Sequence, residues 1–206
     1  MAKVLHVKAS PRAESYSARV ADAFLDAYRK AHRGDSVELL DLLKADIPPF
    51  QAPQSKAKYA VMSGQAPVNE AEAAWESVIR VINDFKGFDK YVLSTPMWNF
   101  GIPYRLKQYF DVIVQPGLTF GYSPEKGYTG MVTGRPAMLI LASGGTYPPG
   151  SPYDFQESYL RCILGFIGFA DIKAIHIAGT LMNKPDQIAA DCVKAEADAR
   201  AAAAGF

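Results

Sequence analysis

Apolar residues along this chain fall into two patterns, short continuous runs and stretches with helical spacing. Short continuous runs are typical of strands buried on both faces of a parallel sheet. The sequence contains five such runs: KVLHVKAS (3–10), SVELLDL (36–42), FDKYVLST (88–95), PAMLILAS (136–143) and ADIKAIHIAG (170–179).

Helices are predicted between these strands, where apolar residues recur every three or four positions. In the stretch 15–33, Tyr16, Val20, Phe24 and Tyr28 are spaced by four, and Gly34 follows as a stop. The same spacing predicts helices at 69–86 with Asn69 as N-cap, from Pro103 to about 114, at 154–168, and through the Ala-rich C-terminal stretch.

Two segments show no clear period. Residues 45–68 hold several prolines, and the pattern there predicts an excursion with one helical turn around Lys58. Residues 115–135 are rich in Gly and Tyr, and they are predicted to form a long loop.

The alternation of strands and helices predicts an α/β fold in a single domain over residues 1–206. Right-handed crossovers lead to a doubly wound parallel sheet with helices on both faces. Five strands fit the order 2-1-3-4-5 better than the six-stranded order, although the pattern alone does not fix it. In such a sheet ligands bind at the carboxyl ends of the strands, where the strand order reverses.

The charge balance excludes some classes of partner. The 22 Lys and Arg residues and 21 Asp and Glu residues give a formal net charge of +1, which predicts no nucleic-acid or anionic-membrane partner. No apolar run reaches the roughly 18 residues that would span a bilayer. The N-terminus also lacks the pattern of a signal peptide. Two cysteines, Cys162 and Cys192, are too few for a disulfide framework or a metal site, and both are predicted to be buried, in a cytoplasmic protein.

The loop after the first strand, SPRAESYS (10–17), predicts a phosphate site. Ser10, Ser15 and Ser17 offer hydroxyls where the first helix begins, and a helix N-terminus presents free N–H groups. Arg12 adds positive charge. The alternative is that Ser15 or Ser17 only caps the helix. The loop lacks the G-x-G-x-x-G dinucleotide motif, and no P-loop motif occurs in the chain.

Two further loops should meet this one at the same edge. STPMWNFGIP (94–103) places Met97, Trp98, Asn99 and Phe100 between prolines and a glycine, so three large side chains occupy a loop. They either form a satellite core or face a flat ligand. In SGGTY (143–147) the two glycines allow close backbone approach. Together the three loops suit a flat heterocycle with one phosphate.

SPRAESYS, TPMWNFGIP, LTFGY (118–122), ASGGTY (142–147) and LGFIGFADI (164–172) occur in this order, and the chain thereby resembles the FMN-dependent NADH-azoreductases, flavodoxin-like NAD(P)H quinone reductases. The resemblance covers nearly the whole chain. Tyr16 stands where a Gln is common in the family, and no Arg separates Ser143 from the glycines. These departures leave the acceptor open.

The resemblance implies the site residues. The FMN phosphate is expected at the first loop, the ribityl chain and flavin ring at the second, and the pyrimidine side of the ring at the third. Aromatic side chains are expected to form the walls of the substrate pocket. For Phe120 and Tyr122 the alternative is that they are surface residues that pack on the edge of the fourth strand. The cofactor residues are Ser10, Ser15, Tyr16, Ser17, Pro96, Met97, Trp98, Asn99, Phe100, Ser143, Gly144, Gly145 and Thr146, and the pocket residues are Phe120, Tyr122 and Phe166.

The function implied is FMN-dependent two-electron reduction of quinones or azo compounds by NADH or NADPH, with ping-pong kinetics and no obligatory catalytic side chain. The segments 45–68 and LGFIGF (164–169) are apolar and unusually aromatic for surface segments, which predicts a homodimer interface. The family implies the same homodimer, in which Phe166 reaches the partner's pocket. Two alternatives are a flavodoxin-type electron carrier and a hydrolase that uses Ser10 or Ser143. Carriers are usually acidic, which this chain is not, and the hydrolase motif G-x-S-x-G is absent.

Overall fold

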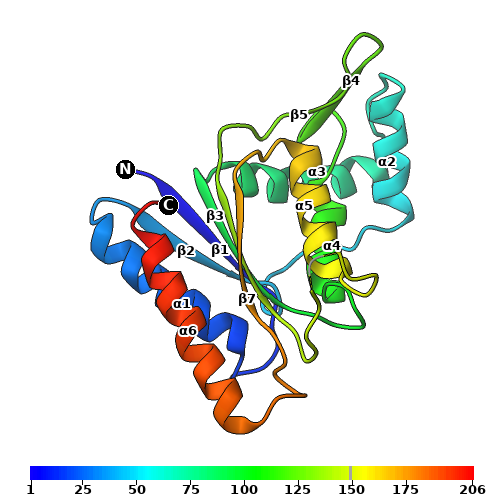
Figure 1. Cartoon of the computed structure of the whole chain (residues 1–206). Coiled ribbons are helices and arrows are strands. Elements are labelled where there is room, and N and C mark those ends of the chain that lie inside the picture. The colour runs from blue at the N-terminus through cyan, green and yellow to red at the C-terminus, as the bar shows by residue number, and fades with distance from the viewer. Residues whose placement is uncertain (149) are drawn as a thin grey trace.

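The structure is a computed structural model that describes residues 1–148 and 150–206. Figure 1 shows strands in the centre with helices on either side. The elements in chain order are β1 (Lys3–Lys8), α1 (Tyr16–Ala31), β2 (Ser36–Asp41), α2 (Ala52–Met62), α3 (Glu70–Lys86), β3 (Lys90–Pro96), α4 (Tyr104–Ile113), β4 (Phe120–Ser123), β5 (Gly127–Gly130), β6 (Ala137–Ala142), α5 (Phe155–Ile167), β7 (Ile172–Ile177) and α6 (Pro185–Ala203).

Five strands form one parallel sheet in the order β2-β1-β3-β6-β7. Numbered along the sheet's own strands this is 2-1-3-4-5, so the predicted order and the flavodoxin-like α/β fold are confirmed. The register pairs Lys8 with Ser94, Pro96 with Ala142, and Ala142 with Ile177. The carboxyl ends of these strands therefore lie along one edge.

Two apolar cores lie against the strands. One joins β1, β3, β6 and β7 to α1 and α6, and Phe24, Tyr28 and Phe206 meet within it as an aromatic cluster. The other core joins the sheet to α3, α4 and α5, with Trp75, Phe85 and Phe110 among its large side chains. The apolar face predicted for the first helix is buried, except that Tyr16 is half-buried. In α3 the buried residues are Ala71, Trp75, Val78, Ile82 and Phe85.

The prediction of one helical turn near Lys58 was wrong, because α2 is a helix of 11 residues. Its N-terminus carries a capping box between Gln51 and Gln54, and Pro53 stands in its first turn. Gln54 and Ala57 are its buried residues, and it packs against α3. This short buried face is too small to produce a visible apolar period.

The loop predicted at 115–135 contains a β-hairpin, β4–β5, so that prediction was also incomplete. Its strands are four residues each and antiparallel, with Phe120 opposite Gly130 and Tyr122 opposite Tyr128. Two glycines in four residues weaken the strand signal in β5. Figure 1 shows the hairpin projecting from the molecule beside α5, at the end opposite to the carboxyl edge of the sheet.

Two local predictions need correction. Asn69 precedes α3 as predicted, but its side chain makes no capping hydrogen bond and its φ is 58°. Cys162 is exposed on α5 and not buried, whereas Cys192 is buried as expected. Within the described parts of the chain, no helix is both long and apolar enough to cross a membrane.

Candidate functional site

A cavity of about 190 Å³ opens at the carboxyl edge of the sheet. The backbone ladder continues past the strands here, because Ala9 N donates to Ser94 O, Met97 N to Ala142 O and Ser143 N to Ile177 O. The loops after β1, β3, β6 and β7 are thus held side by side. They line the cavity with Ser10, Pro11, Arg12, Ser15, Tyr16, Pro96, Met97, Trp98, Ala142, Ser143, Gly144, Thr180 and Leu181.

The N-terminus of α1 forms one wall of the cavity. Ser15 is the N-cap, and its Oγ accepts from Ala18 N at 3.3 Å and lies 3.1 Å from Ser17 Oγ. Among residues 1–148 and 150–206, no acceptor is found for the N–H groups of Tyr16 and Ser17. Capping and ligand binding therefore coexist at Ser15, because the cap satisfies one N–H and leaves two free.

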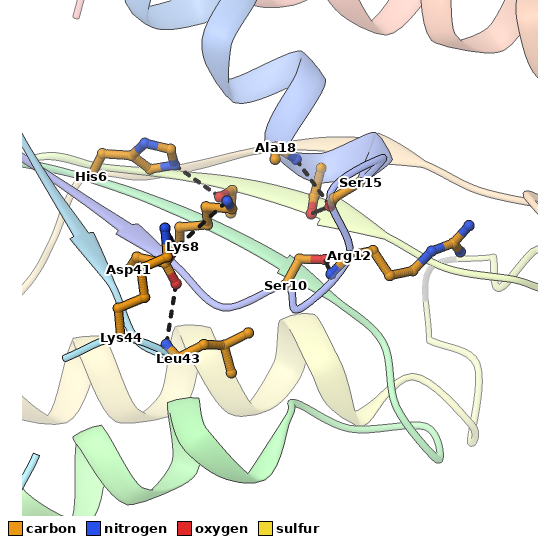
Figure 2. Close-up of polar contacts among 11 residues, drawn as sticks. His6, Lys8, Ser10, Arg12, Ser15, Ala18, Asp41, Leu43 and Lys44 are labelled. Atoms are coloured by element: carbon orange, nitrogen blue, oxygen red, sulfur yellow. Dashed lines mark hydrogen bonds and ion pairs between the residues drawn. The ribbon is translucent and has the colours of Figure 1, made fainter. Parts of the chain in front are cut away.

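Ser10 and Arg12 complete this wall. The Ser10 hydroxyl accepts a long bond of 3.4 Å from Arg12 N, and the Ser10 side chain is almost fully buried. Figure 2 shows Ser10 and Ser15 on the two sides of the loop, with the Arg12 side chain extending outward. The hydroxyls of Ser10 and Ser15, the free N–H groups and the helix N-terminus form a cradle whose chemistry suits a phosphate, with the buried Ser17 hydroxyl behind Ser15.

Another wall of the cavity is formed by Ser143 and Gly144, at the start of the loop Ser143–Gly145. Its three carbonyls all accept bonds from the loop after β7: Thr180 N to Ser143 O at 3.1 Å, Leu181 N to Gly144 O at 3.0 Å, and Gly179 N to Gly145 O at 3.1 Å. A trans peptide points its N–H away from its C=O. The N–H groups of Gly144, Gly145 and Thr146 therefore point away from 179–181, and none has an acceptor within the described chain.

The segment after β3 makes a strained turn at the rim of the cavity. Trp98 and Gly101 exchange two backbone bonds of 2.9 Å, and the residues between them, Asn99 and Phe100, have φ of 47° and 68°. Such values match a type I′ turn, and a bulky residue like Phe100 rarely adopts them. The turn is held by a bond from Phe155 N to Phe100 O and by the Tyr153 ring, 5.4 Å from that of Phe100. Strain of this kind is concentrated at functional sites.

The predicted site residues divide into three groups. Eight line the cavity: Ser10, Ser15, Tyr16, Pro96, Met97, Trp98, Ser143 and Gly144. Ser17, Asn99, Phe100, Gly145 and Thr146 are neighbours in sequence that do not line it. Phe120, Tyr122 and Phe166 lie at the hairpin end of the molecule, where the rings of Phe120 and Phe166 are 4.7 Å apart and those of Tyr122 and Tyr128 are 5.1 Å apart.

The arrangement fits FMN. The cradle at α1 matches a single phosphate, and the Gly144 N–H, which has no acceptor within the described chain, matches the carbonyl and nitrogen acceptors of a flavin pyrimidine ring. Met97 and Trp98 supply an apolar surface between the two. The cavity is smaller than the roughly 300–1,000 Å³ of closed ligand pockets, so such a ligand must extend past the rim.

Thr180 and Leu181 are cavity residues that the sequence analysis missed. The signal was present, since Gly179 and Thr180 follow the last strand at the same carboxyl edge. The loop after the fifth predicted strand lies at the same edge as the loops after the first, third and fourth strands, so a ligand contact is expected there too.

His6 lies under the site, in the middle of β1, as a structural residue. Its Nε2 lies 2.8 Å from Ser94 Oγ, and the side chain is buried. Burial, with smaller effects of Lys8 and Arg29, lowers the pKa of His6 from 6.5 to about 4. The imidazole is therefore neutral at pH 7.

We expect this histidine to make the protein less stable in mild acid. Between pH 6.5 and pH 4, His6 binds a proton in the unfolded chain but not in the folded chain. The contribution of neutral His6 to the free energy of unfolding is therefore fully present above pH 6.5 and is lost as the pH falls towards 4. The loss amounts to about 3 kcal/mol over this window, at about 1.4 kcal/mol per pKa unit. Urea unfolding from pH 7.5 to 4 would measure it, and His6→Gln should remove this part of the slope. Equal slopes in the two proteins would contradict the assignment.

Comparison with known proteins places the chain among flavin enzymes. A family model described as Flavodoxin-like fold matches residues 2–202. An FMN-dependent NADH:quinone oxidoreductase of Nitratidesulfovibrio vulgaris (strain DP4) is 51% identical, with 100% of both chains covered. An azoreductase structure from Bacillus anthracis str. Sterne is 30% identical with a TM-score of 0.91 over 100% of both chains. An FMN-dependent NADH-azoreductase from Bacillus anthracis str. Ames Ancestor in complex with FMN is 27% identical, with a TM-score of 0.86 over 98% of each chain.

Proposed function

We propose a function from the premise that this chain belongs to the flavodoxin-like family of FMN-dependent NADH:quinone oxidoreductases and azoreductases. It is an FMN-dependent enzyme that carries two electrons from NADH or NADPH to a quinone or azo acceptor. The observation that carries this proposal is the cavity at the carboxyl edge, which is lined both by the phosphate cradle at the start of α1 and by Ser143 and Gly144, and the Gly144 N–H has no acceptor within the described chain.

Each wall has a role in holding the cofactor. Ser10, Ser15 and Ser17 and the first N–H groups of α1 bind the phosphate, with Tyr16 beside them. Pro96, Met97 and Trp98 contact the ribityl chain and the flavin ring. Asn99 and Phe100 have N–H groups without an acceptor among the described residues, and in this proposal these groups meet the edge of the ring. Ser143, Gly144, Gly145 and Thr146 bind the pyrimidine side.

When bound, FMN would supply the redox chemistry, which is hydride uptake from the donor and two-electron reduction of the acceptor. The protein's part is to orient and to stabilise charge. The N–H groups of Gly144 and Gly145 stabilise negative charge on the pyrimidine side, as preorganised donors do in an oxyanion hole. No side chain of the cavity is needed as an obligatory acid or base, because water at the open rim can exchange protons.

The expected kinetics are ping-pong, because the chain covers one side of the cofactor site. Met97 and Trp98 form that side, so NADH and the acceptor must use the other side in turn. Steady-state rates at several fixed acceptor concentrations should give parallel double-reciprocal lines against NADH. Intersecting lines would show that both substrates bind together, and would contradict a shared side.

We also propose that the chain acts as a homodimer. Phe120, Tyr122 and Tyr128 of the hairpin and Phe166 of α5 form an aromatic cluster at the end of the molecule opposite to the cavity, and Tyr122 and Tyr128 are each 66% exposed. Exposed aromatic clusters commonly mark interfaces. A two-fold partner brings this cluster over the open rim of the other cavity, where Phe120, Tyr122 and Phe166 shape the substrate pocket.

We further propose that residues 1–206 form a single domain, since both cores share one sheet. The sheet is doubly wound, with right-handed crossovers between its parallel strands. The location is the cytoplasm, where an exposed free thiol such as that of Cys162 stays reduced.

The cofactor itself tests the proposed function. We expect the purified protein to be yellow and to release one FMN per chain on heating, because the structure offers one phosphate cradle. Chromatography of the released flavin identifies it, and turnover of NADH with a quinone separates an enzyme from an electron carrier. Recovery of mainly FAD, or no flavin after incubation with FMN, would overturn the proposal.

A further inference from the structure

Thr180 makes two hydrogen bonds to the carbonyl of Ser143, in the loop that is proposed to bind the pyrimidine side of the flavin. Its backbone N donates to Ser143 O at 3.1 Å, and its Oγ1 donates to the same oxygen at 3.0 Å. The Ser143 carbonyl belongs to the same peptide as the N–H of Gly144. Both donors therefore act on the peptide group whose N–H is offered to the ligand.

Two consequences follow for that N–H. The pair of bonds fixes the plane of the Ser143–Gly144 peptide, and so the direction of the Gly144 N–H. Donation to a carbonyl also polarises its peptide, which strengthens the N–H of that peptide as a donor by about 10–30% per bond. A stronger and better aimed donor favours a ligand edge that carries more negative charge.

The loop that carries Thr180 is itself held rigidly. Gly179 is buried with φ of +72°, and a Cβ at this position would overlap with the Asn183 amide. Asn183 N donates to Gly179 O at 2.9 Å, and Asn183 Nδ2 donates to Asp191 Oδ2 of α6 at 3.4 Å. Removing the Thr180 hydroxyl therefore deletes one bond, while the backbone bonds of residues 179–181 keep the loop in place.

We propose that Thr180 is a positioning residue which, acting through the Ser143–Gly144 peptide, makes the site bind reduced FMN more tightly than oxidised FMN. This inference rests on the proposed function and deepens it. It assigns control of the flavin potential to the loop after β7, which touches the cavity but which none of the motifs of the family resemblance includes. Two-electron reduction changes the pyrimidine edge of the flavin from neutral to anionic. The polarised Gly144 N–H binds the anionic edge more strongly than the neutral one.

The test compares hydroxyl-free variants with a variant that keeps the hydroxyl. Thr180→Val preserves the shape of the side chain, Thr180→Ala is a second hydroxyl-free form, and Thr180→Ser retains the donor. The affinity for oxidised FMN comes from fluorescence titration, the two-electron midpoint potential from reduction against a reference dye, and the Tm from thermal unfolding. We expect Val and Ala to keep the affinity for oxidised FMN within about twofold and to lose affinity for reduced FMN about tenfold. That ratio corresponds to a potential about 30 mV more negative for a two-electron couple.

Thr180→Ser should match the wild type in both measurements. A wild-type potential in Val and Ala, a shift in Ser as large as in Val, or loss of oxidised FMN binding in both hydroxyl-free variants would overturn the inference and leave the proposed function standing. Failure of the wild-type protein to bind FMN would overturn both.

Discussion

Replacing Ser15 with aspartate is expected to abolish tight FMN binding without lowering the stability of the apoprotein. Ser15 has two functions in this structure, as the N-cap of α1 and as a wall of the phosphate cradle. Aspartate is as good an N-cap as serine, and its charge suits the positive end of the helix dipole. The same charge faces the phosphate. Two unit charges about 4 Å apart near a protein surface repel by on the order of 4 kcal/mol.

At about 1.4 kcal/mol per tenfold change, this repulsion weakens FMN binding several hundredfold. Fluorescence titration of the apoprotein with FMN measures the effect, and thermal unfolding of the apoprotein shows whether the cap survives. Ser15→Asn is the matched control, because asparagine also caps helices and differs from aspartate by one charge. The Asn variant should bind FMN far more tightly than the Asp variant. Equal affinities in the two would mean that no phosphate lies at α1.

The sequence predicted the sheet well because buried parallel strands leave a strong mark. The run AMLILA before Ser143 is apolar and buried throughout, and the run YVL before Ser94 is likewise apolar and buried, as is typical of central strands of a parallel sheet. The helix faces also repeat over several turns. From these elements the carboxyl edge followed, and eight of the predicted residues line the cavity found there.

What the sequence did not reveal depends on tertiary contacts. The helix α2 buries only Gln54 and Ala57, so its formation follows from its capping box and from α3 and not from an apolar period. The β4–β5 hairpin has two glycines in a four-residue strand, and it lies against the end of α5. Thr180 supports the cavity from a loop whose residue types carry no distinctive chemistry until its hydrogen bonds are known.

The junction of the hairpin with α5 is where the second large effect is expected. Gly130, the last residue of β5, lies against the backbone of Ile167 and Gly168, and a Cβ at Gly130 would overlap with their atoms. Nearby, Val132 N donates to Ile167 O at 2.8 Å, and Phe120 of β4 contacts Phe166. Both contacting groups are backbone atoms, which cannot move aside as the end of a flexible side chain can. The glycine is thus required by the closeness of two chain segments.

Gly130→Ala should therefore destabilise the protein by about 3 kcal/mol, at the upper end of the usual cost of overpacking. For a chain of this size that lowers the Tm by about 6–12 °C. Gly121→Ala on the facing strand is the matched control, because its Cβ would lie 3.5 Å from Thr129 Oγ1, an ordinary contact. Thermal unfolding compares the two, and a Tm of Gly130→Ala within a few degrees of Gly121→Ala would contradict the close approach.

The same pair of variants tests the role of the hairpin in function. If its aromatic cluster completes the rim of a partner's cavity, then forcing the hairpin away from α5 separates Phe120 from Phe166 and disrupts that surface. At a temperature where Gly130→Ala remains folded, we expect weaker dimerisation in sedimentation and a higher KM for the acceptor. Binding of FMN should change much less, because the phosphate cradle at α1 lies at the other end of the sheet. A Gly130→Ala protein that is monomeric yet keeps the wild-type KM would show that each chain completes its own substrate pocket.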